Sequence, residues 1–161
     1  MSFDFSALIT DRTQADVNRV GQISAKIKTG TASASELAEF NGAAMKGAYN
    51  YTDLNRVGSA AQYVADCFNR LGYAVCVEPK TDWTELDAPI LSNMEQYLSV
   101  LAVLRNVVSV MKSTPNVPLD MERLTYVEAN NIEKILVDID FLLTNAAKAW
   151  CYSGDVFSGE V

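Results

Sequence analysis

The sequence predicts an all-α protein, a helical bundle of about five helices of which three are long. Apolar residues recur at spacings of three and four through most of the chain, which is the period of an amphipathic helix. Several of these stretches begin with Ser, Thr or Asn followed three positions later by an acidic residue, the pattern of a helix N-cap. Glycine follows several of them, where a helix C-cap belongs.

Two short helices are predicted in the first third of the chain, after an extended lead over residues 1–11. Thr13 caps the first helix and Gly30 ends it. Ser33 caps the second helix, which closes at Gly47. The inward-facing residues are Val17, Val20, Ile23 and Ile27 in the first helix, and Leu37, Phe40 and Ala44 in the second.

Three long helices are expected to form the frame of the bundle, joined by short links. Their ranges and N-cap residues are 51–72 with Asn50, 92–112 with Ser92, and 126–151 with Thr125. The first has an inward seam of Leu54, Val57, Ala61, Val64, Phe68 and Leu71. The second is apolar around most of its circumference, which predicts a central position packed on several sides. The third has a core stripe of Ile132, Ile135, Leu136, Ile139, Leu142, Leu143, Ala146 and Trp150.

Two short segments are predicted to be extended. Residues 73–78 are the one plausible strand, and residues 153–161 repeat a Ser-Gly-acidic-Val motif after the last helix. The bundle domain is therefore placed at 1–152 and an extended C-terminal docking tail at 153–161. Whether this tail meets a neighbour or folds back on its own bundle stays open. The candidate interface residues are Trp83, Tyr152, Val156, Phe157 and Val161.

Composition excludes several classes of function. Thirteen basic and twenty acidic residues give a net charge of −7, and the basic residues are scattered singly apart from Lys26 and Lys28. Nucleic acid and anionic membrane surfaces are therefore not expected partners, because both require clustered positive charge. No apolar run approaches the ~20 residues that cross a bilayer.

No motif for catalysis, for a cofactor or for a metal ion is found. The chain has no histidine, which removes the usual general base and His-liganded zinc. Cys67, Cys76 and Cys151 lack metal-ligand spacing and are expected to be reduced core residues. Asp138 and Asp140 diverge on the last helix, with Asp140 nearer the apolar stripe, and predict a solvated or salt-bridged face. The acidic residues at 82–87 lack the pattern of a calcium loop.

Five stretches together resemble a known family. They are residues 11–20 (DRTQADVNRV), 47–57 (GAYNYTDLNRV), 80–83 (KTDW), 124–136 (LTYVEANNIEKIL) and 152–160 (YSGDVFSGE). The chain resembles small structural proteins of tailed phages and prophages of gut-type Gram-positive bacteria. The resemblance covers nearly the whole chain and implies a virion-structural role near the tail, baseplate or fibre, with no catalytic residues to assign.

The expected function is therefore that of a non-enzymatic structural subunit of a tailed phage, present in repeated copies and assembled in the host cytoplasm. Other phage structural proteins would be its partners, in the virion. One alternative is a host-recognition or fibre-adaptor module, which would bind a cell-wall glycan through an exposed Trp83. A second is a head-attached capsid accessory protein. The weakest is a small enzyme or regulator, for which Cys76 is the thiol to probe.

Overall fold

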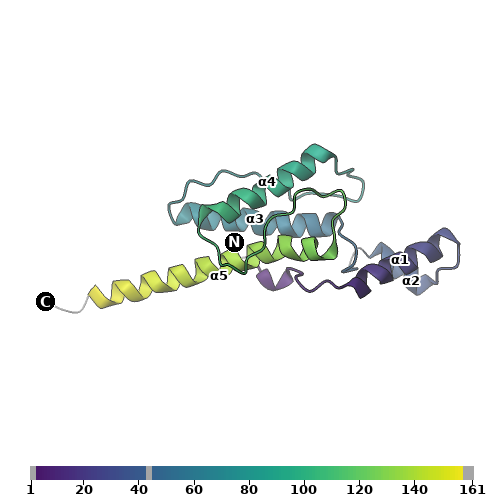
Figure 1. Ribbon diagram of the computed structural model, residues 1–161, viewed down its shortest axis with the longest axis horizontal. Helices are drawn as coiled ribbons and strands as arrows, with labels where there is room; N and C mark the ends of the chain where they lie inside the picture. Colours follow the sequence, from purple (N-terminus) through teal and green to yellow (C-terminus); the bar gives the residue numbers. More distant parts are fainter. Residues whose placement is uncertain (1–2, 43–44, 158–161) are drawn as a thin grey trace.

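The computed structural model describes residues 3–42 and 45–157, and over these residues the protein is all-helical, without strands. A 3₁₀ turn, η1 (Phe5–Ala7), comes first. The helices follow as α1 (Gln14–Lys28), α2 (Ala34–Asn41), α3 (Tyr51–Arg70), α4 (Leu91–Val107) and α5 (Tyr126–Phe157). The predicted all-α bundle with three long helices is confirmed. Figure 1 shows α3, α4 and α5 packed together.

The three long helices run in the same direction. Residues near the start of each meet at one end of the bundle, where Leu54, Leu91 and Leu124 line a common groove. Further along, Asp140 of α5 lies close enough to Tyr63 of α3 to act on it electrostatically. The three helices are therefore parallel to one another, and all begin at the same end of the bundle.

The prediction of short links between the long helices is wrong. The links span residues 71–90 and 108–125, because each must carry the chain back along a helix to restart at the same end. A helix of 17 to 20 residues is about 26 to 30 Å long, so the return needs at least about 8 to 9 extended residues. The helical periodicity does not tell whether a link makes a tight turn into an antiparallel helix or runs back along the bundle to start a parallel one.

The core lies between α3, α4 and α5. The predicted seam of α3 is confirmed from Leu54 to Phe68, and Ile132, Ile135, Leu136 and Ile139 of α5 are fully buried. Asn50 and Thr125 cap α3 and α5 through boxes with Asp53 and Glu128, as predicted.

Helix α4 departs from its prediction in three ways. It begins at Leu91 with Ile90 in the N-cap position and no side-chain cap, so Ser92 does not cap it. It ends at Val107, five residues before the expected position 112. Val103 is exposed, so α4 is not packed on all sides. Its apolar residues are buried on the side that faces α3 and α5.

The segment 73–78 is extended but forms no strand. Val75 and Val77 are half-buried against the core, while Ala74, Cys76 and Glu78 on either side of them are exposed. This alternation is what an extended chain on an apolar surface produces. A strand also needs a neighbouring strand to accept its backbone hydrogen bonds, and the described part of the chain offers none.

Helices α1 and α2 form a hairpin that lies beyond the end of the bundle where α3 begins (Figure 1). Both predicted capping boxes, with Asp16 and Glu36, are present, and Gly30 adopts a φ of 68° after α1. Leu37 and Phe40, predicted to face inward, are each 39% exposed, because α2 packs mainly against α1 and not against the bundle core. Ala44 lies outside the described residues.

The prediction that Gly47 closes the second helix is wrong, because α2 ends at Asn41 with Gly42 as its C-cap. Gly47 instead lies against the backbone of α1, where a Cβ atom would overlap the carbonyl group of Asp16. It therefore permits the close approach of the chain that leads from the hairpin to α3.

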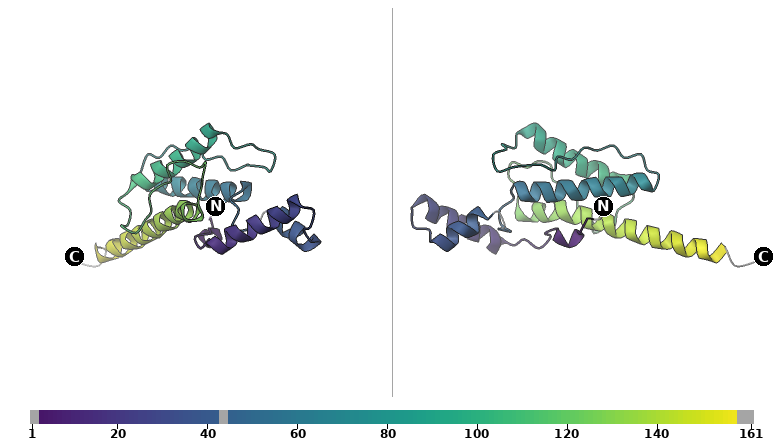
Figure 2. Two further views of the ribbon diagram at one scale, coloured as in Figure 1. Left: turned by 45° about the vertical axis from the view of Figure 1, so that its right-hand side comes forward. Right: turned by 180° about the vertical axis from the view of Figure 1, so that it is seen from behind.

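Helix α5 continues well past the bundle. At 32 residues it is about 48 Å long, against about 30 Å for the 20 residues of α3. The core stripe therefore stops near Ile139; Leu142 and Leu143 are half-buried, and Ala146 is exposed rather than inward-facing. The views in Figure 2 agree that this extension and the α1–α2 hairpin lie at opposite ends of the molecule.

The predicted extended tail is only partly covered by the described residues. Residues 153–157 are the last residues of α5, so they are helical rather than extended. The helix thus crosses the predicted domain boundary at residue 152 without a break. Residues 158–161 lie outside the described part of the chain.

Candidate functional site

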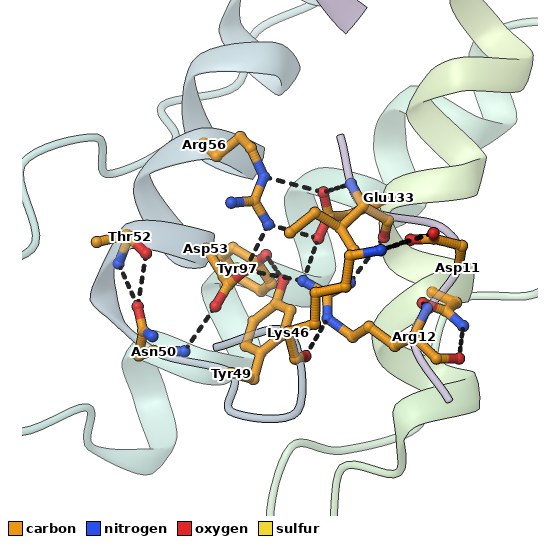
Figure 3. Close-up of polar contacts among 12 residues, drawn as sticks. Asp11, Arg12, Lys46, Tyr49, Asn50, Thr52, Asp53, Arg56, Tyr97 and Glu133 are labelled. Carbon is orange, nitrogen blue, oxygen red and sulfur yellow. Dashed lines mark hydrogen bonds and ion pairs between the residues drawn. The ribbon is translucent and has the colours of Figure 1, made fainter. Parts of the chain in front are cut away.

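Four charged side chains meet inside the protein near the starts of α3 and α5 (Figure 3). Arg12 donates from Nη2 to Asp53 Oδ1 at 2.8 Å and to Glu133 Oε1 at 2.7 Å. Arg56 donates to Glu133 Oε2 at 3.1 Å and Oε1 at 2.8 Å, and also pairs with Asp53. Glu133 is 0% exposed. We call Arg12, Asp53, Arg56 and Glu133 the ion network.

The backbone completes the ion network. Arg12 also donates from Nη1 to the carbonyl oxygen of Ile9 at 2.7 Å and from Nε to that of Lys46 at 3.1 Å. The amide of Ile9 donates to Glu133 Oε2 at 2.7 Å, and the amide of Asn50 donates to Asp53 Oδ2 at 2.9 Å. Asn130 adds two bonds to the backbone of Arg12, both at 2.9 Å.

This bonding pattern indicates a structural role. Two arginines balance two carboxylates, and each carboxylate oxygen of Asp53 and Glu133 accepts at least one hydrogen bond. A catalytic acid or base needs an open position that faces a substrate, and a metal ligand needs a free lone pair. Buried ion pairs with all partners in place instead hold chain segments in one arrangement. Here they join the N-terminal lead, the segment before α3, α3 itself and α5.

Two tyrosines beside the ion network also form a closed pair. The hydroxyl groups of Tyr49 and Tyr97 are 2.6 Å apart, and the guanidinium group of Arg12 lies 5.3 Å from the ring centre of Tyr49. Burial raises the pKa of both phenols above the ordinary value of 10, so both stay protonated near neutral pH. They therefore serve as hydrogen-bonding groups rather than as bases.

Three of the five stretches that carry the resemblance converge on this place. Residues 11–20 supply Arg12, residues 47–57 supply Asp53 and Arg56, and residues 124–136 supply Asn130 and Glu133. Sequence analysis did not find the ion network. The available signal was Glu133, a charged residue set among the buried isoleucines of the α5 stripe. Asn130 binds the extended lead rather than a neighbouring helix.

Trp83, proposed as an interface residue, is only 5% exposed and covers the bundle. Asn55 of α3 holds its backbone with two hydrogen bonds of 2.7 and 2.8 Å. Lys80 lies 4.8 Å from its ring centre, and a Cβ atom on Gly58 would overlap the carbonyl oxygen of Lys80. The ring lines a cavity of about 50 Å³ between α3 and α4, and its Nε1 has no hydrogen-bond partner among the described residues.

The other carboxylates also have structural partners. Asp138, not Asp140, is the buried member of its pair; it accepts hydrogen bonds from Thr114 and Lys134 at 2.8 and 2.7 Å. Burial raises the pKa of Asp140, which is half-buried. In the acidic loop, Asp82 and Asp87 pair with Lys80. The described residues contain no group of three or more Cys, Asp or Glu side chains that could hold a metal ion.

The remaining predicted residues lie on the extension of α5 or beyond it. Tyr152, Val156 and Phe157 are within the helical backbone, but their side chains are not described, and neither is that of Cys151. Val161 is outside the described residues. Of the other cysteines, Cys76 is exposed and Cys67 half-buried, so Cys76 is not the core residue that was predicted.

Large apolar side chains are exposed at the end of the bundle where the helices begin. A groove there is lined by Tyr49, Leu54, Pro89, Leu91, Met94, Met121, Glu122 and Leu124. We call it the starting-end groove. Leu91 is 60% exposed, and Leu86 and Leu119, in the adjoining segments, are 90% and 98% exposed. Such clustering of exposed apolar side chains marks contact surfaces more often than isolated ones do.

Comparison with known proteins identifies no relative. A scan against protein-family models found no match, and searches of curated proteins and of solved structures found none either. None of the described helices is long and apolar enough to span a membrane.

Proposed function

We propose that the protein is a non-enzymatic structural subunit of a tailed phage particle, located near the tail, baseplate or fibre. The family resemblance of the five stretches motivates the phage assignment. The observation that best supports a structural role is the apolar starting-end groove, together with the continuation of α5 past the bundle at the opposite end (Figure 2). The ion network supports it as well, since it makes a rigid body of segments distant in the sequence.

The glycan-binding alternative loses its proposed site. Aromatic recognition of a sugar needs an accessible ring face, and Trp83 is buried with Lys80 over its ring. The head-attached alternative keeps its place, because the same apolar ends would serve a contact on a capsid. A thiol enzyme has little to support it, because exposed Cys76 has no histidine to activate it in a chain without this residue.

Mass spectrometry of purified particles tests the proposed function. We expect the protein in mature virions, in a fixed ratio to the tail proteins and in more than one copy. Tailless heads and isolated tails from the same preparation then separate the two locations. Absence of the protein from mature particles would overturn the structural role.

A further inference from the structure

We propose that copies of this protein join head to tail, with the α5 extension of one copy seated in the starting-end groove of the next. The inference rests on the proposed function, which calls for repeated subunits, and it names the partner as a second copy of the chain. The first argument for it is the geometry of α5.

Helix α5 starts beside the starting-end groove and leads away from it. Leu124, just before the helix, lines the groove, and the last helical residue lies about 48 Å further along the axis. The extension therefore cannot fold back into its own groove without breaking the helix. Only another molecule can bring an α5 extension to this end.

The extension also lacks the features of a helix that stays in water. Between Phe141 and Gly154 the sequence has one charged residue, Lys148. Phe141 is 55% exposed and Ala146 is exposed, so one side of the described part of the extension is open to solvent, while Leu142 and Leu143 are half-buried. Solvated helices depend on charged faces, and most helical stability in proteins comes from packing of an apolar face.

The groove suits a helix of this composition. Two methionines and two leucines near its opening are adaptable apolar contacts of the kind found in helix-binding grooves. Lys148 and Asp155 leave the extension without net charge, so it does not repel the groove, which Glu122 lines. The chain as a whole carries −7, so copies repel each other except where charge is low or opposite.

A contact between two different surfaces of the same chain is heterologous. It generates a ring when the rotation between copies closes and an open helical filament when it does not. Either product gives each copy an equivalent neighbour on both sides.

Analytical ultracentrifugation of two variants and their mixture tests the proposal. The groove variant is Leu91→Glu with Met121→Glu, and the extension variant is Ala146→Glu with Lys148→Glu. The wild-type protein should sediment as species larger than a dimer, and each variant alone as a monomer. Mixed together they should form a 1:1 dimer that grows no further, because the groove variant still has a sound extension and the extension variant a sound groove.

Circular dichroism confirms that each variant is folded, and Val103→Glu, an exposed apolar position on α4, serves as the control that should still assemble. A wild-type protein that stays monomeric at its highest soluble concentration overturns the proposal. So does assembly by the groove variant alone, which would instead show pairing of two α5 extensions. Neither outcome bears on the virion role, which is tested separately by mass spectrometry of purified particles.

Discussion

The bundle of α3, α4 and α5 and the α1–α2 hairpin are both helix packed on helix, but different forces hold them. The bundle has a continuous apolar core and the buried ion network. The hairpin has one fully buried side chain, Ile23, which lies outside that core. Exposed ion pairs, Lys26 with Glu36 at 2.5 Å and Arg19 with Glu39 at 2.8 Å, join its two helices. Because the hairpin has so small a core, we expect it to open at a lower free energy than the bundle.

The ion network is where the two regions are tied together, because Arg12 stands just before α1 and Glu133 lies within the bundle. Replacing Glu133 by Ala would leave Arg12 buried without its main partner and the amide of Ile9 without an acceptor. Loss of one partner of a buried pair costs about 3–5 kcal/mol. We expect that decrease in the free energy of unfolding, measured by urea denaturation.

The control for Glu133→Ala is Glu95→Ala, on an exposed position of α4, where the change should be within about 0.5 kcal/mol. A small effect at Glu133 would show that the ion network contributes little to the link between the lead and the bundle. We also expect the hydrogen bond between Tyr49 and Tyr97 to be weakened in Glu133→Ala, because the Tyr49 ring lies against Arg12.

A matched pair of isoleucines separates the two cores. Ile23 of α1 and Ile135 of α5 are both 0% exposed, so the same Ile→Ala change creates a cavity in each region. Such changes cost about 2–5 kcal/mol. For Ile135→Ala we expect global unfolding at lower denaturant. For Ile23→Ala we expect local opening of the hairpin, with little change in the bundle.

Native-state hydrogen exchange distinguishes these outcomes residue by residue. In the Ile23→Ala variant the amides of α1 and α2 should lose protection while those of α3 keep theirs. Equal loss of protection in α3 would mean that the hairpin and the bundle unfold as one unit, and would contradict the expectation that the hairpin opens first.

Two glycines, Gly47 at the junction between hairpin and bundle and Gly21 within α1, allow a similar comparison with smaller expected effects. A Cβ atom on Gly47 would overlap the backbone of Asp16, whereas one on Gly21, within α1, would meet nothing within 4 Å. Gly47→Ala should therefore destabilise by about 1–3 kcal/mol, as overpacking does. Gly21→Ala should stabilise by about 0.5–1 kcal/mol, because alanine is the better helix former.

Thermal melting of the two glycine variants beside the wild-type protein gives the sign directly. If Gly47→Ala melted like the wild type, the close approach of Gly47 to α1 would not be a requirement of the fold. The two substitutions are chemically identical, so any difference between them belongs to the position.

The local sequence predicted most of the helices and their caps, since a cap such as Thr13 with Asp16 involves residues three positions apart. It did not predict the direction of the long helices, because nothing in the period of α3 or α4 tells whether the link turns back. The ion network was missed for a related reason: Arg12 and Glu133 are 121 residues apart, and only the tertiary fold brings them together. The burial of Trp83, a candidate interface residue, could not be predicted, because burial of a loop residue depends on the helix beneath it.

Acid should affect the stability of the hairpin and of the bundle differently, and this is the smallest of the expected effects. The pKa of Glu36 is lowered from 4.5 to about 2, first by Lys26 and then by its cap contacts at Ser33, and Arg19 lowers the pKa of Glu39. A lowered pKa in the folded state means stability that is present above the unfolded-state value and is lost as the pH falls towards the folded-state value. The hairpin should therefore weaken between pH 4.5 and about 2.

In the bundle, Asp140 has the opposite sign. Burial raises its pKa, so its protonation on acidification favours the folded state. An NMR titration of amide exchange through this pH range should show α1 and α2 losing protection more steeply in the wild type than in Glu36→Gln, which has no such carboxylate to protonate. If the two proteins lost hairpin protection with the same pH dependence, the ion pair of Lys26 with Glu36 would be a surface contact that adds nothing to the stability of the hairpin.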